Sequence, residues 1–147
     1  MPTPRDIRRL AFSALFQLDA QGEEALEAVR ASLDESGDAS DGPLRPQDRD
    51  KAFEFAKAAF DQRMEADREV AALSPGWPPN RQPAADRAII RLAHYEMTSG
   101  RTAPKVVVNE AVELAKEFST ERSPAFVNGV LDKILKRVLR EAPQSEK

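Results

Sequence analysis

The chain of 147 residues contains no cysteine, one histidine and one tryptophan. Without cysteine it can form neither a disulfide framework nor a thiolate metal site. The single histidine, His94, leaves only carboxylates to complete a metal site, and these are a poor ligand set for zinc. No apolar run approaches the roughly 18 residues of a membrane-spanning helix. The basic start is not followed by an apolar stretch with a small-residue cleavage site. We therefore expect a cytoplasmic protein with no membrane segment and no metal.

Sequence motifs of catalysis are also missing. The six glycines are scattered, and none of them forms a G-x-G-x-x-G or G-x-x-x-x-G-K phosphate loop. No G-x-S-x-G elbow is present. His94 lies between Ala93 and Tyr95 in a helical pattern, which favours a packing or surface role. Spacing alone leaves a Ser-His-Asp triad open, because such triads assemble in space. The sequence predicts a protein that is not an enzyme and needs no cofactor.

Charge restricts the ways in which this chain can bind nucleic acid. Hydrophobic residues make up 41% and charged residues 32%, a composition typical of a globular domain. The net charge of −3 argues against a generally basic nucleic-acid binder. Any RNA site must therefore be a local patch. Basic side chains cluster at both ends of the chain: Arg5, Arg8 and Arg9 at the start, and Lys133, Lys136, Arg137 and Arg140 near the end.

Apolar residues recur at helical spacing, and no segment shows sustained alternation of period two. A break near Asp67 would divide the third helical segment, and four prolines and a glycine between residues 74 and 83 prevent a regular helix there. Residues 36–46 form a second predicted loop. The fold class is therefore all-α, a compact bundle of about six to seven helices. The predicted helical segments are 4–20, 23–35, 47–73, 84–99, 104–118 and 123–140.

Several residues are of a type that is unusual at their position, and each has a structural or a functional interpretation. Trp77, in the proline-rich loop, is expected to be a packing anchor, because tryptophan is buried on average. Asn109, Asn128 and Gly129 interrupt apolar helical stripes, and Gly129 costs ~1 kcal/mol relative to alanine. We interpret them as packing residues, with Gly129 allowing a neighbouring helix to approach closely. Phe126 lies in a first helical turn, where a core or staple role and stacking on an RNA base both stay open.

The arginine-rich start also has two interpretations. Arg5 and Arg9 are one helical turn apart, and Arg8 lies beside them. Guanidinium groups near a helix N-terminus can hold phosphates and stack on splayed bases. The alternative is an ordinary solvated basic helix start.

Three motifs occur in order along the second half of the chain: DRAIIRLAHYE at 86–96, PKVVVNEAVELAK at 104–116 and FVNGVLDK at 126–133. Together they resemble the NusB family of transcription antitermination factors. The start, RRLAFSALFQ at 8–17, is similar to the family's arginine-rich first helix. The resemblance covers nearly the whole chain.

The resemblance implies one RNA-binding domain over residues 1–147, built from two helical halves at 1–73 and 84–140, with a tail at 141–147. Members of the family bind the boxA element of ribosomal RNA leader transcripts together with NusE, a small-subunit ribosomal protein. The pair joins the transcribing RNA polymerase complex, suppresses premature termination and supports ribosomal RNA synthesis.

Site residues follow from the same resemblance. The expected RNA-binding residues are Arg5, Arg8, Arg9, Arg122, Ser123 and Phe126. The expected NusE-binding residues are Phe16, Asp86, Arg91 and Glu96. This sequence departs from the family where Asp6 interrupts the basic start, where Ala125 replaces a common basic residue, and where Phe16 replaces a tyrosine.

Two alternatives stay open. The protein could be a self-associating helical regulator, since some relatives dimerise, and a homodimer could hide the arginine face. It could also be a helical adaptor that acts with a ribosomal RNA methyltransferase, because a similar domain precedes the catalytic part of some of those enzymes.

Overall fold

A computed structural model describes residues 3–34 and 44–141. Within these residues it contains seven α-helices, two short 3₁₀ helices and no strand, which confirms the all-α prediction. The chain divides into two compact units, Met1–Arg63 and Met64–Lys147, so the division comes earlier than the end of the predicted N-terminal half at residue 73. Most of the predicted loop at 36–46, and the predicted tail from residue 142 onward, lie outside the described residues.

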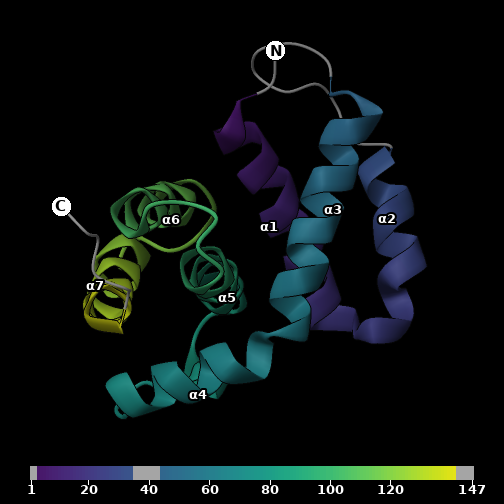
Figure 1. Cartoon of the computed structure of the whole chain (residues 1–147). Helices are drawn as coiled ribbons and strands as arrows, with labels where there is room; N and C mark the ends of the chain where they lie inside the picture. The colour runs from purple at the N-terminus through teal and green to yellow at the C-terminus, as the bar shows by residue number, and fades with distance from the viewer. Residues whose placement is uncertain (1–2, 35–43, 142–147) are drawn as a thin grey trace, which may run out of the picture. The chain divides into compact units, whose positions relative to one another are not determined.

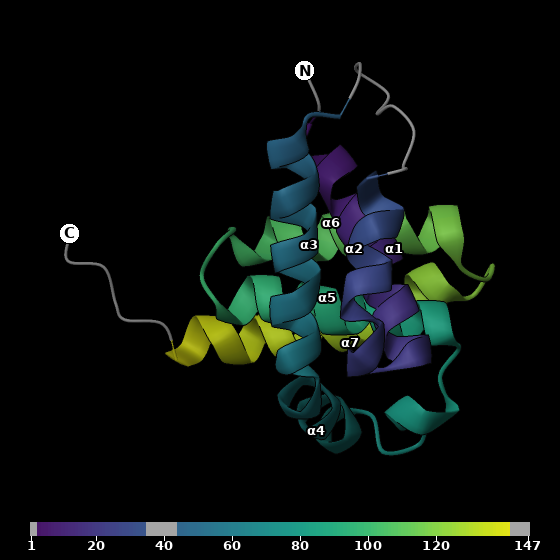
Figure 2. The same cartoon turned by 90° about the vertical axis from the view of Figure 1, so that its right-hand side faces the viewer.

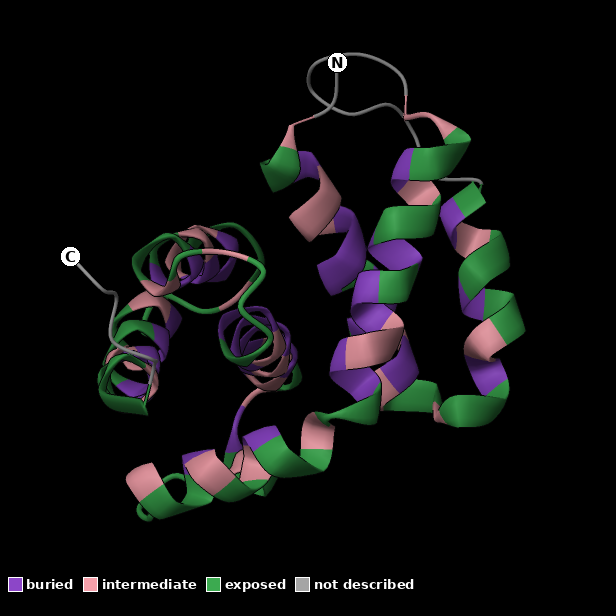
Figure 3. Cartoon of the chain, in the orientation of Figure 1, coloured by how far each residue is buried: buried purple, intermediate pink, exposed green. Residues whose placement is uncertain are grey.

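Unit 1 is a group of three packed helices. It contains α1 (Pro4–Gln21), η1 (Glu23–Ala25), α2 (Leu26–Asp34) and α3 (Pro46–Asp61). The three α-helices lie side by side in both views of the chain (Figures 1 and 2). Buried residues line the facing sides of α1 and α3 (Figure 3). The large side chains of this core are Phe12, Leu15, Leu18, Val29, Leu33, Phe53, Phe55 and Phe60.

Local hydrogen bonds fix both ends of α1. The Thr3 N–H donates to the Asp6 carboxylate over 2.9 Å, and the Asp6 N–H donates to the Thr3 hydroxyl over 3.1 Å. This capping box gives hydrogen-bond acceptors to the N–H groups of Thr3 and Asp6, which would otherwise lack partners at the start of the helix. Asp6, which interrupts the basic start, is therefore the N3 partner of the N-cap residue Thr3 in this capping box. At the other end Gly22 adopts φ +90°, which suits glycine, and its N–H donates to the Leu18 carbonyl.

The break in the third predicted segment lies before Asp67. Helix α3 ends at Asp61, and the Gln62 N–H donates to the carbonyls of Ala58 and Ala59 at 3.1 and 3.2 Å. Helix α4 then begins at Arg63. No proline or glycine lies at this break.

Unit 2 is built around one nearly enclosed helix. It contains α4 (Arg63–Leu73, whose first residue falls in unit 1), η2 (Pro79–Arg81), α5 (Ala84–Thr98), α6 (Pro104–Phe118) and α7 (Ser123–Glu141). Helices α6 and α7 pack against α5 and against each other. Helix α5 is buried over most of its surface (Figure 3). The core side chains of this unit include Ile89, Ile90, Leu92, Met97, Val107, Leu114, Val127, Leu131 and Ile134.

Helix α4 is attached to the rest of unit 2 largely by charged side chains. It buries only Ala66 and Val70. The guanidinium of Arg91 on α5 donates to both carboxylate oxygens of Asp67, at 2.9 and 2.5 Å. Such paired, charge-assisted bonds are stronger and more directional than neutral ones. Charge pairing therefore contributes to holding α4 in place, a role that buried apolar side chains have in the other helices.

Glu69 is the second charged anchor of α4. Its carboxylate accepts from His94 Nε2 at 2.9 Å and from Arg137 Nε at 2.7 Å. His94 is 5% exposed, which agrees with the packing role expected for it. Burial alone raises the pKa of Glu69, but the hydrogen bonds from Arg137 and His94 outweigh burial and leave that pKa below its ordinary value.

Gly129 does not face a neighbouring helix. A Cβ added to it meets nothing within 4 Å, so the expectation of a close helix approach is wrong. Asn109 and Asn128 are exposed as well, so neither packs in a helix interface.

An alanine at position 129 is therefore expected to stabilise unit 2. Gly129→Ala removes the helix penalty of glycine, up to ~1 kcal/mol, without a steric conflict. Gly100→Ala is the matched control, because that site is equally open but has φ +75° and disfavours a side chain. Urea unfolding followed by the fluorescence of Trp77 should show a higher free energy of unfolding than the parent protein for Gly129→Ala and a lower one for Gly100→Ala. Equal stability of the two variants would contradict this interpretation.

Candidate nucleic-acid interface

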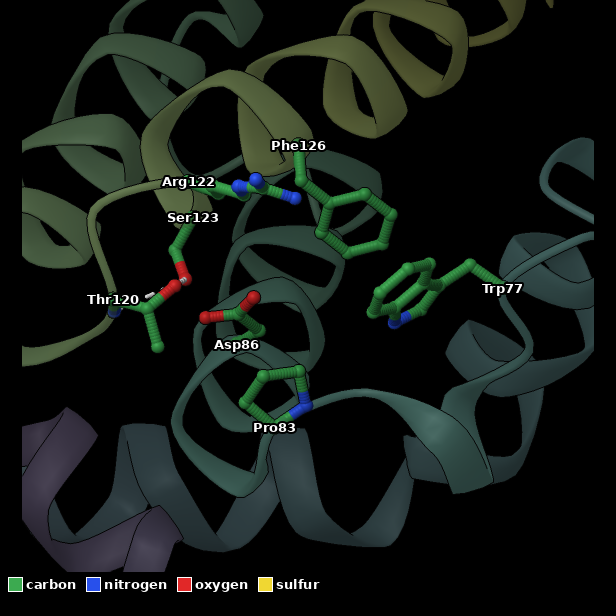
Figure 4. A pocket seen from close by; sticks show the side chains of 7 residues that line it. All are labelled: Trp77, Pro83, Asp86, Thr120, Arg122, Ser123 and Phe126. Atoms are coloured by element: carbon green, nitrogen blue, oxygen red, sulfur yellow. Dashed lines mark hydrogen bonds between the residues drawn. The ribbon is translucent and has the colours of Figure 1, made fainter.

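Unit 2 contains a cavity of about 290 Å³ where the start of α5 meets the turn between α6 and α7. The proline-rich loop before α5 closes one side of it (Figure 4). Its lining residues come from three separate parts of the chain: Trp77 and Pro83, Asp86, and Thr120, Arg122, Ser123 and Phe126. The structure thus brings together Asp86, Arg122, Ser123 and Phe126, which the sequence assigned to two different binding roles.

A chain of hydroxyl groups holds one wall of this cavity. The Ser123 hydroxyl donates to the Ser119 hydroxyl over 2.9 Å, and the Ser119 hydroxyl donates to the Asp86 carboxylate. The Ser123 oxygen also accepts from the Thr120 N–H at 3.1 Å. Asp86 is only 2% exposed, so a buried charge is stabilised by these bonds. The network ties the first turn of α5 to the turn before α7.

Ser123 holds this turn in place from the start of the last helix. It is the first residue of α7. Its hydroxyl bonds backward to Thr120 and Ser119, in the turn. Ser123 thus fixes the backbone on which Arg122 and Phe126 are mounted.

Two aromatic rings form the opposite wall. The ring centroids of Trp77 and Phe126 are 6.0 Å apart with their planes inclined at 46°. Trp77 is 51% exposed, so the expectation of a buried packing anchor is wrong. The loop that carries it is held by bonds from the Trp77 N–H to Ser74 and from Gln82 to the Trp77 carbonyl. Phe126 is half-buried, with its ring directed toward Trp77 (Figure 4).

Charge is distributed unevenly around the cavity. The Asp86 carboxylate lies on the wall opposite Trp77, and the exposed side chain of Arg122 lies beside Phe126 (Figure 4). Ala125 is exposed and adds no charge. The arrangement offers an apolar surface for a ring and one guanidinium for an anion. The buried carboxylate disfavours an anion inside the cavity itself.

The arginines predicted to bind RNA lie in the first two turns of α1, in unit 1. Arg5 is exposed, whereas Arg8 and Arg9 are half-buried. Arg9 Nη1 lies 3.2 Å from Asp6 Oδ1. The carboxylate of Asp6 therefore balances part of the charge of Arg9.

The residues predicted to bind a protein partner have different environments. Phe16 on α1 is 40% exposed and forms a tilted pair with Phe12, at 6.0 Å between centroids. Arg91 is bound to Asp67. Glu96 is 5% exposed and accepts from the Thr102 hydroxyl at 2.6 Å, which holds the loop between α5 and α6. Of these side chains, Phe16 is the one that offers a broad apolar surface.

Sequence reasoning missed Trp77 as a cavity residue. The available signal was its position, in a loop that leads directly into the motif starting at Asp86. Within residues 3–34 and 44–141, no group of three or more histidine, cysteine, aspartate or glutamate side chains is arranged to hold a metal ion. None of the helices that the structure describes is both long and apolar enough to cross a membrane.

The chain is similar to proteins of one family, in sequence and in structure. The sequence model of the NusB family matches residues 5–136. The transcription antitermination protein NusB of Symbiobacterium thermophilum is 39% identical over 135 residues, which are 90% of this chain and 88% of that protein. The solved structure of T. maritima NusB is similar with a TM-score of 0.78 at 31% identity, over 92% of this chain and 93% of that one.

A chain from a crystal structure of antitermination factors NusB and NusE in complex with dsRNA is similar in fold. The TM-score is 0.75 at 24% identity, over 90% of this chain and 96% of that one.

Proposed function

Because the chain belongs to the NusB family, we propose that it is a transcription antitermination factor that binds boxA RNA together with NusE. In this role it acts within the transcribing RNA polymerase complex and supports ribosomal RNA synthesis. The observation that carries the proposal is the family match over residues 5–136, which spans both the arginine-rich start of α1 and the cavity of unit 2. The activity is binding, not catalysis, and its place is the cytoplasm.

RNA contacts are proposed on each unit. On α1 the guanidinium groups of Arg5, Arg8 and Arg9 bind backbone phosphates, which supply most of the sequence-independent affinity. In unit 2, Arg122 binds a phosphate and Phe126 offers a ring to a base. Ser123 contributes through the hydroxyl network that holds the turn between them. The whole chain is then a single RNA-binding domain.

NusE contacts are proposed on each unit, at Phe16 of α1 and on α5. An exposed aromatic ring is typical of residues that contribute most to a protein interface. Replacement of the family's tyrosine by Phe16 removes a hydroxyl but keeps the apolar area. The assignments of Asp86, Arg91 and Glu96 stay predictions. Their buried or bonded side chains suit a role in shaping the face of α5 more than direct contact.

A titration of fluorescently labelled boxA RNA tests the proposal. We expect binding to strengthen when purified NusE is present, and to weaken as salt rises because phosphate contacts release counterions. An RNA of the same length and composition with a scrambled boxA sequence is the control. No binding to boxA RNA, even with NusE at saturating concentration, would refute the proposed function.

A further inference from the structure

The cavity beside α7 has the size and chemistry of a site for a single planar group. At about 290 Å³ it lies at the lower end of the range for small-molecule pockets. Three rings line it: the aromatic rings of Trp77 and Phe126 and the pyrrolidine ring of Pro83. A cavity of this volume has no room for a helix or a folded peptide segment. It can admit one flat ring system at its open side.

We infer that this cavity captures one unstacked RNA base, with Trp77 as a base-stacking residue. The inference rests on the proposed RNA-binding function and extends it to a residue that no motif had indicated. Trp77 is 51% exposed, which leaves part of its surface open for stacking. Stacking on an aromatic ring accepts any of the four bases, because each of them has a π-face.

Charge determines which part of a nucleotide enters. The Asp86 carboxylate on the inner wall repels a phosphate, whereas an uncharged base has no such penalty. Arg122, at the outer side of the same cavity, can bind the phosphate of the nucleotide whose base is inside. Among the lining residues the Asp86 carboxylate is buried, whereas the side chains of Trp77 and Arg122 are exposed, which matches a base that points in and a backbone that stays out.

The geometry of the aromatic pair specifies how the base lies. Trp77 and Phe126 are already in contact, with 6.0 Å between centroids, so a base cannot be sandwiched between them. It stacks instead on the face of Trp77 that is open, and its edge meets Phe126 and Pro83. The bonds that hold the loop, from Trp77 to Ser74 and from Gln82 to Trp77, keep the indole in place before RNA arrives. Such preorganisation reduces the ordering cost of binding.

The test uses Trp77 as its own reporter, because it is the only tryptophan of the chain. The full-length protein is titrated with boxA RNA, with and without NusE, and the separately measured emission of NusE and RNA is subtracted. We expect the emission of Trp77 to change as RNA binds. In a series of RNAs that each carry one abasic position, a single position should abolish most of that change.

Variants test the energetic role. Trp77→Ala should weaken boxA binding about tenfold or more, and Trp77→Phe should retain most of the affinity. The slope of binding against salt should stay unchanged in both, since stacking releases no counterions. Phe118→Ala is the matched control, because Phe118 is an exposed aromatic residue of unit 2 outside the cavity. Circular dichroism establishes that each variant is folded.

The possible failures can be told apart. If RNA binds but the emission of Trp77 does not change, and Trp77→Ala binds as the parent protein does, the base-capture site is refuted and the proposed function stands. If boxA RNA does not bind at all, both are refuted.

Discussion

Replacing Arg5, Arg8 and Arg9 together with alanine is expected to reduce boxA affinity by well over tenfold at moderate salt. Each phosphate contact on a single strand contributes about 0.7 to the slope of log K against log salt concentration. Three lost contacts should therefore lower the slope by about 2. The effect should be the same for boxA and scrambled RNA in relative terms, because phosphates carry no sequence information.

A triple lysine variant separates charge from shape, because lysine keeps the positive charge but loses the planar, forked group. It should retain the salt slope while losing part of the affinity. An unchanged slope in the triple alanine variant would show that α1 does not contact the RNA backbone.

The helices could be predicted from the sequence because the signals that define them are local. Gly22 and Gly100 end helices with positive φ, and Pro46 and Pro104 begin them. The break between α3 and α4 was misplaced because the apolar spacing continues through Phe60 to Met64. In the structure that stripe stops at the break between α3 and α4, since Met64 is 69% exposed. Periodicity alone does not distinguish a continuing apolar stripe from an exposed methionine after a turn.

The cavity could be predicted only in part, because it depends on tertiary packing. Asp86 and Phe126 lie in motifs that the sequence reveals, but nothing in their spacing places them on the same cavity. Trp77 was expected to be buried on the statistics of its residue type. Its exposure follows from the conformation of its loop, which bonds to Ser74 and from Gln82 hold in place and which residue statistics do not reveal. Gly129 was likewise assigned to packing because its cost in a helix is visible in the sequence, whereas its open surroundings are not.

Removing the Glu69 carboxylate is expected to have the largest effect on folding among the polar substitutions considered. Glu69→Ala leaves Arg137 and His94, both bonded to that carboxylate, without their shared acceptor. Hydrogen bonds to charged groups contribute about 1.5 to 3 kcal/mol, so we expect a loss of about 2 kcal/mol at pH 7. Helix α4 has few apolar contacts to compensate, since it buries only Ala66 and Val70. Urea unfolding followed by Trp77 fluorescence measures this loss within unit 2.

The pH dependence of this loss identifies the carboxylate as its cause. The hydrogen bonds that outweigh burial hold the pKa of Glu69 below its ordinary value. A carboxylate with a lowered folded-state pKa stabilises the protein fully above its unfolded pKa, about 4.3, and loses that contribution as pH falls through the folded value. The stability gap between parent and Glu69→Ala should therefore narrow below about pH 4. Glu65→Ala, an exposed site on the same helix, is the matched control and should show almost no gap at any pH. A gap for Glu69→Ala that stays constant from pH 7 to acid unfolding would mean that lost packing, not the ionised carboxylate, accounts for the destabilisation.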